Sequence, residues 1–181
     1  MPAFDARAVA NLILDLAGED RKDISNLVLQ KLVYFAHGQY LNQTGHPLVA
    51  GEFEAWQYGP VHPHVYNAFK EQGASAIRTR AQSVNPVTGE RRAIPPLADN
   101  AAREVISDVY RSLKRRSPTS LVAVSHAKNA PWHFVVERAK HHDSISMRIP
   151  NAVIRERFRF HAISMSMNEE AGVPDENSPF A

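Results

Sequence analysis

The chain has 181 residues, a length that fits one domain with a core large enough to fold alone. It contains no cysteine, which excludes disulfide bonds, zinc–thiolate sites and thiol nucleophiles. The N-terminus carries acidic side chains and no long apolar stretch, and no apolar run reaches the ~18 residues of a membrane span. We therefore expect a soluble cytoplasmic protein without a signal peptide or a membrane segment.

The formal net charge is only +2, but it is unevenly distributed. Residues 165–181 contain four acidic side chains and no basic one, so the rest of the chain carries 21 basic and 15 acidic side chains, a charge of +6. Such a surface could attract nucleic acid or an acidic protein. Basic side chains on solvated helix faces are the more common explanation, and we therefore expect no nucleic-acid partner.

The N-terminal part of the chain predicts two helices. Apolar residues at helical spacing predict the first over residues 5–17, with Asp5 as its N-cap. Asp23 or Ser25 then opens a second helix that runs to about residue 42, with Gly45 beyond its end. This second helix is apolar on almost every side, which is typical of the buried centre of a domain.

Polar side chains nevertheless follow one line along the second helix. Gln30, Tyr34 and His37 fall within ~60° of one another at ~100° per residue. Buried polar groups cost roughly 1–3 kcal/mol unless they form hydrogen bonds, so this line must meet partners. Two arrangements remain open, an internal hydrogen-bond network and the lining of a groove.

The middle of the chain predicts β structure among helices. Residues 52–57 form a short strand, and Gln57-Tyr58-Gly59-Pro60 is a turn that enters a helix over residues 61–72. A period-two pattern between residues 77 and 94, with a turn at 85–89, predicts a hairpin over about 76–95. This hairpin projects from the helical body and could pair with the strand at 52–57.

The C-terminal half is helical. Asp99 caps a long helix to about Arg116. Shorter helices follow over about 120–127, 131–140 and 150–160. Residues 165–181 lack periodicity and predict a disordered acidic tail. The fold class is therefore mainly α (α+β), a single compact helical domain over residues 1–164 with a small antiparallel β element.

No pattern in the sequence is typical of a catalytic or metal site. His62-x-His64 is the tightest histidine spacing, but Pro60 and Pro63 place it at a turn and a helix start, without accompanying carboxylates. Ser125-His126 is not the geometry of a catalytic triad, and no glycine-rich phosphate loop occurs. We expect no catalytic residue, no metal and no cofactor.

Aromatic and histidine side chains gather around the Gly59-Pro60 turn. They offer large contact areas with polar tips, which is the composition of binding hot spots. The predicted partner-binding residues are Trp56, Tyr58, Gly59, Pro60, His62 and Tyr66, supported by Gln30, Tyr34 and His37. Within this set we expect Tyr58 and His62 to be exposed contacts and Trp56 to belong to the core.

Two motifs resemble the Panacea-domain family of SocA-type antitoxins. They are L-Q-K-L-V-Y-F-A-H at Leu29–His37 and E-A-W-x-Y-G-P-V at Glu54–Val61, about fifteen residues apart. A weaker similarity to the family, a Leu-x-x-x-Ser-His run followed by Pro-Trp, occurs at Leu121–His126 and Pro131-Trp132. The resemblance extends from about residue 4 to residue 160 and implies an antitoxin that binds and neutralises a cognate protein toxin.

The family's name-giving type implies a mechanism as well. That antitoxin is understood as an adaptor that presents its toxin to the ClpXP protease, and that toxin blocks replication at the sliding clamp. Direct sequestration of the toxin is the alternative, and residues 165–181 would be either a solvated end or a tether to the protease. A DNA-binding regulator is a further alternative, but the helix at 131–140 is too apolar for a helix that reads a DNA groove.

Overall fold

The protein is described by a computed structural model in which residues 3–141 and 146–161 are placed. The helices within these ranges are α1 (Ala6–Glu19), α2 (Asn26–Thr44), α3 (Pro63–Phe69), the 3-10 helix η1 (Lys70–Gln72), α4 (Asn100–Leu113), α5 (Pro118–Ser125), α6 (Pro131–Lys140) and α7 (Asn151–Arg157). The strands are β1 (Phe53–Trp56), β2 (Gly59–Val61), β3 (Gln82–Val84), β4 (Arg91–Ala93) and β5 (Arg148–Ile149). The predicted mainly α class with small antiparallel elements is confirmed. The predicted tail at 165–181 lies outside the described residues.

The helix boundaries follow the capping residues of the sequence. Asp5 precedes α1 and its side chain accepts a hydrogen bond from the backbone N–H of Arg7. Asp99 does the same for α4, where the donor is the N–H of Ala102. Of the two predicted starts of α2, Ser25 is the observed N-cap, and Gly45 ends the helix with φ of 74°. No helix in the described part of the chain is both long and apolar enough to cross a membrane.

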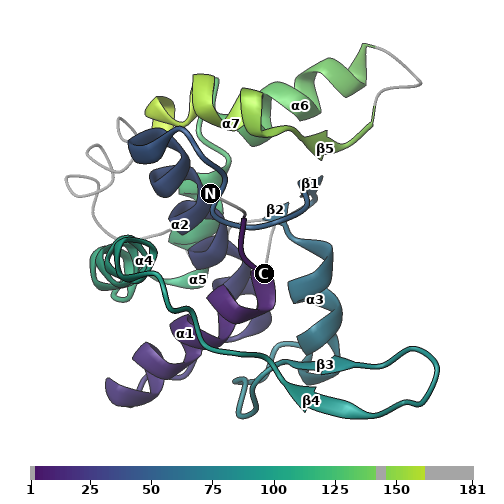
Figure 1. Cartoon of the computed structure of the whole chain (residues 1–181). Helices are drawn as coiled ribbons and strands as arrows, with labels where there is room; N and C mark the ends of the chain where they lie inside the picture. The colour runs from purple at the N-terminus through teal and green to yellow at the C-terminus, as the bar shows by residue number, and fades with distance from the viewer. Residues whose placement is uncertain (1–2, 142–145, 162–181) are drawn as a thin grey trace.

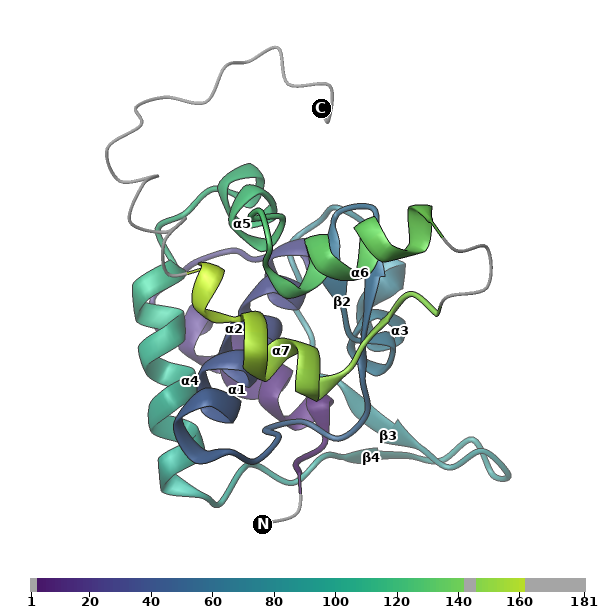
Figure 2. The same ribbon diagram turned by 90° about the horizontal axis from the view of Figure 1, so that it is seen from above.

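Helix α2 is the centre of the fold. It packs against α1, α3, α4, α5 and α7, and Figures 1 and 2 show it surrounded by these elements. Gly38 lets α7 approach closely, because a Cβ at this position would overlap the ring of Phe158. The prediction that this helix is buried on nearly all sides is confirmed.

A three-stranded antiparallel sheet with the order β2-β1-β5 lies beside α2. Trp56 pairs with Gly59 across the first strand pair, and Phe53 pairs with Ile149 across the second. The predicted helix start at Val61 is therefore wrong. The chain reverses at Gln57-Tyr58 and returns as β2, and α3 begins at Pro63.

The predicted hairpin is present as β3 and β4, but its suggested pairing with the strand at 52–57 is wrong. The hairpin forms a separate two-stranded sheet that projects from the helical body in both views (Figures 1 and 2). Its base is held elsewhere, because Asn11 of α1 exchanges hydrogen bonds of 3.0 and 2.8 Å with the backbone of Ala81. The free edge of β1 is taken instead by β5, a strand too short to predict from sequence.

Candidate partner-binding surface

Trp56, Tyr58 and Tyr66 form an aromatic surface around the β1–β2 turn. Trp56 is 36% exposed and Tyr58 is 45% exposed. The rings of Trp56 and Tyr66 meet edge to face with centroids 4.7 Å apart, and the Trp56 Nε1–H donates to Glu54 Oε2 over 2.7 Å. The expectation that Trp56 is a core residue is therefore wrong. Glu54 and Trp56 point outward because Phe53 and Ala55, which alternate with them, are buried.

The expectation that His62 is an exposed contact is also wrong. Its side chain is 1% exposed, and its backbone N–H donates to Gln30 Oε1 over 2.8 Å. Its Nε2 lies 3.0 Å from the carbonyl oxygen of Ala50. Gly59 and Pro60 are buried as well. These residues lie behind the aromatic surface and hold it in place.

The polar line on α2 is buried completely and forms internal hydrogen bonds. Besides accepting from His62, Gln30 donates through Nε2 to Asn26 Oδ1 over 3.1 Å. The hydroxyl of Tyr34 bonds to His161 Nε2 over 3.0 Å. His37 Nε2 bonds to Asn151 Oδ1 over 2.9 Å. The structure thus favours internal hydrogen bonding over a lined groove, although each residue binds a different segment and they do not form one network.

Lys31 lies within the first motif but was not among the predicted site residues. Its side chain is fully buried on α2, and Nζ donates to the carbonyl oxygen of Pro60 over 3.0 Å. Removal from water lowers the pKa of Lys31 to about 7. The sequence did contain an indication of this role. A lysine inside an otherwise apolar helix is expected to be buried, and a buried amine requires a hydrogen-bond acceptor.

Gly59 lies directly against this lysine. Its φ is 100°, and a Cβ here would overlap Ser125 Oγ and lie 2.9 Å from Lys31 Nζ. Helices α2 and α5 therefore converge on the back of the turn through a residue that must be glycine.

Helices α5 and α6 also support the strand that leads into the turn, through residues of the weaker Ser-His and Pro-Trp similarity. The rings of His126 and Trp132 stack with centroids 3.7 Å apart and an angle of 9°. Trp132 Nε1–H donates to the carbonyl oxygen of Trp56 over 2.8 Å. Burial, followed by the charge on Lys31, lowers the pKa of His126 to about 4. His126 and Trp132, which belong to this weaker similarity, thus help to hold β1 in place.

The family comparison matches this region directly. The family model described as "Antitoxin SocA-like, Panacea domain" matches residues 29–133. The chain is also 43% identical over 177 residues to Antitoxin SocA of Caulobacter vibrioides (strain NA1000 / CB15N), a match that covers 98% of this chain and 94% of that protein. The chain belongs to the SocA-like antitoxin family. No solved structure matches it.

The matched region of this SocA-like antitoxin contains the buried support and the aromatic surface together. Lys31, Gly59 and Trp132 all fall between residues 29 and 133. Several basic side chains of the described residues pair with carboxylates, as Arg78 does with Asp23 over 2.7 Å.

Replacing Lys31 by methionine is expected to stabilise the protein at pH 7 by about 1–3 kcal/mol, since the cost of burying an amine exceeds the loss of its hydrogen bond. The unfolded chain holds this proton up to the ordinary lysine pKa of 10.5, whereas the folded chain releases it near 7. The stability of the parent should therefore rise between pH 7 and about 10, and Lys31→Met should abolish this rise. Urea denaturation at both pH values measures the effect.

The exposed Lys70 provides the matched control for this replacement. Lys70→Met should leave both the stability at pH 7 and its rise with pH as they are in the parent. A Lys31→Met variant less stable than the parent at pH 7 would show that the hydrogen bond to Pro60 outweighs the burial of the amine.

Proposed function

We propose that this chain is a cytoplasmic antitoxin that binds a protein toxin encoded beside it, one to one, through Trp56, Tyr58 and Tyr66. It presents the bound toxin to the ClpXP protease and has no catalytic turnover of its own. The toxin is of the class that blocks replication at the sliding clamp. The antitoxin role is supported by the family and by the relative named Antitoxin SocA.

The proposed contact surface is supported mainly by the exposure of the Trp56 and Tyr58 rings on a turn whose backbone is held by hydrogen bonds. Trp56 is 36% and Tyr58 is 45% exposed at the same turn, and Trp and Tyr are enriched in binding hot spots. Their backbone is held from behind by Lys31, Gln30 and Trp132. A partner therefore meets a surface that needs little ordering on binding, which reduces the entropic cost of association.

Gly59, Pro60 and His62 take a different role in this proposal. Because these three residues are buried, they shape the β1–β2 turn without touching the toxin. Gln30 supports the same turn through the N–H of His62. Tyr34 and His37 bond to the C-terminal helical segment and act on the fold as a whole.

Alanine at Trp56 or Tyr58 is expected to weaken toxin binding by about 1–4 kcal/mol, the range of hot-spot truncations. The neighbouring open reading frame is first tested for lethality when it is expressed alone and for rescue by this chain. The complex is then isolated by size-exclusion chromatography and its affinity measured by calorimetry. Melting temperatures of the free variants separate lost contacts from lost stability.

Val87, which is 91% exposed on the projecting hairpin, provides the control position. Val87→Ala should bind the toxin as the parent does. Unchanged affinity in the Trp56 and Tyr58 variants would place the contact elsewhere. In a reconstituted ClpXP reaction, degradation of the toxin should depend on this chain, whereas an intact toxin in a stable complex would establish sequestration instead.

A further inference from the structure

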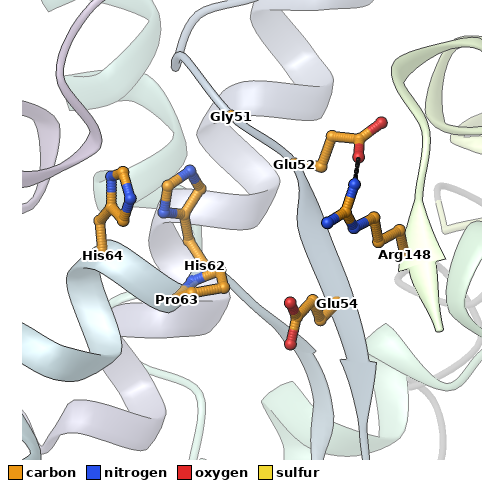
Figure 3. Close-up of a pocket in the computed structure, with 7 residues that line it drawn as sticks. All are labelled: Gly51, Glu52, Glu54, His62, Pro63, His64 and Arg148. Atoms are coloured by element: carbon orange, nitrogen blue, oxygen red, sulfur yellow. Dashed lines mark ion pairs between the residues drawn. The ribbon is translucent and has the colours of Figure 1, made fainter. Parts of the chain in front are cut away.

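A pocket of about 260 Å³ lies beside the aromatic surface. Its lining includes Glu52, Glu54, His62, His64 and Arg148 (Figure 3). Since one water molecule occupies about 30 Å³ of liquid, this volume can take a long side chain. The pocket is adjacent to the proposed toxin contact because Glu54 accepts the hydrogen bond of Trp56.

The charges of the pocket favour a cation. Arg148 is directed at Glu52 in Figure 3, at a distance of 3.6 Å between Nη1 and Oε2. Glu54 has no ion-pair partner among the described residues, and its hydrogen bond from Trp56 uses Oε2 alone. One carboxylate is therefore left to pair with a positive group from outside.

His62 independently requires a hydrogen-bond donor for its Nδ1 atom. Its Nε2 faces the carbonyl oxygen of Ala50, which only accepts, so Nε2 carries the proton and Nδ1 is an acceptor. Nδ1 is buried and has no hydrogen-bond partner within the described ranges. A buried acceptor without a donor costs about 1–3 kcal/mol, so a ligand that supplies an N–H recovers this energy.

We infer that this pocket binds an arginine side chain of the partner toxin, an inference that rests on toxin binding at the aromatic surface. A guanidinium group carries a positive charge that can pair with the Glu54 carboxylate, and it presents several N–H donors for an acceptor such as His62 Nδ1. His64 is exposed, and its ring faces that of His62 at a centroid distance of 5.6 Å (Figure 3). Because His62 Nδ1 is fully buried, the guanidinium reaches it only if the exposed ring of His64 moves aside.

Other ligand classes fit these groups less well. An anion would meet the carboxylates of Glu52 and Glu54. Among the residues that the structure places, no three His, Asp or Glu side chains are arranged to hold a metal ion. A lysine ammonium is a compact point charge without the planar fork that spans a carboxylate and a second acceptor.

The probe that tests the pocket without the toxin is N-acetyl-arginine N-methylamide, followed by NMR on the full chain. Saturable shifts are expected at the backbone amides of residues 51–54, His62 and His64 and at the His62 Nδ1 nitrogen. The uncharged citrulline analogue should produce none, and the lysine analogue should bind more weakly. Glu54→Gln keeps an acceptor for Trp56 and should weaken arginine binding about tenfold or more, the range of a charge-assisted bond.

The exposed Glu104 on α4 provides the matched control, and Glu104→Gln should bind the arginine probe as the parent does. Absence of saturable shifts, or equal shifts with the citrulline analogue, would overturn the inference. The same two variants are then compared in toxin binding, where Glu54→Gln alone should lose about tenfold in affinity. If the toxin binds the parent and Glu54→Gln equally, the arginine pocket is refuted and the proposed function stands. If the probe binds but no toxin does, the affinity of the pocket for arginine stands, whereas the proposed function and the toxin as the source of the arginine both fail.

Discussion

Gly59→Ala is expected to lower the free energy of unfolding by about 3 kcal/mol or more, through backbone strain and crowding together. The φ of 100° is outside the range that non-glycine residues prefer, which costs of order 1–3 kcal/mol. The added Cβ would also overlap Ser125 Oγ and crowd Lys31 Nζ at 2.9 Å. Because Lys31 and Ser125 both lie in a packed interior, neither can yield without a further loss of about 1–3 kcal/mol. Urea denaturation measures the loss.

Gly89 in the projecting hairpin separates the two contributions. Its φ is 72°, but nothing lies within 4 Å of an added Cβ, so Gly89→Ala carries the strain without the crowding. Ser125→Ala should restore part of the loss in the Gly59→Ala background, since it removes the nearest obstructing atom. If Gly59→Ala and Gly89→Ala lower the free energy of unfolding equally, the added Cβ at Gly59 does not destabilise the protein by crowding Ser125 and Lys31. The surviving folded Gly59→Ala protein should also bind the toxin less tightly, because the turn that presents Tyr58 is displaced.

Acid is expected to destabilise the protein by about 3 kcal/mol for each of His37 and His161 between pH 6.5 and 4. Burial lowers the pKa of both histidines to about 4 from 6.5, so the unfolded chain takes up protons that the folded chain refuses. Stability is therefore fully present above pH 6.5 and is lost as the pH falls towards 4. The hydrogen bonds of both rings also explain why the folded chain disfavours the second proton. His37 Nδ1 accepts from the N–H of Val49, and His161 Nε2 faces the hydroxyl of Tyr34, so a second proton would remove an acceptor.

The measurement is the free energy of unfolding in urea at several pH values from about 7.5 to about 4, a range that covers the loss expected between the unfolded and folded pKa values. His161→Gln keeps hydrogen-bonding groups but cannot take up a proton, so its stability should fall less steeply with acid. His46, which is exposed, provides the matched replacement. If the stability of the parent is constant over this range, the prediction that His37 and His161 have lowered pKa values in the folded protein is refuted.

The sequence predicted the polar line on α2, because helical geometry and the cost of burying polar groups are sufficient to expect it. It also placed the aromatic residues at the β1–β2 turn. Which of them face solvent could not be predicted, since the exposures of Trp56 and His62 depend on β2 folding back beside β1. Once that pairing forms, the alternation along β1 directs Trp56 outward, and His62 is enclosed between Ala50 and Gln30.

Local signals determined most of the fold. The helix starts at Asp5 and Asp99, the central position of α2 and the projecting hairpin all follow from caps, periodicity and turn residues close together in the chain. Tertiary structure alone decided that β5 completes the sheet and that Lys31 bonds to Pro60. These are contacts between distant segments, and a two-residue strand or a single lysine carries too little local preference to specify its partner. The partner is selected by the shape of the packed core and by the need of each buried polar group for a hydrogen bond.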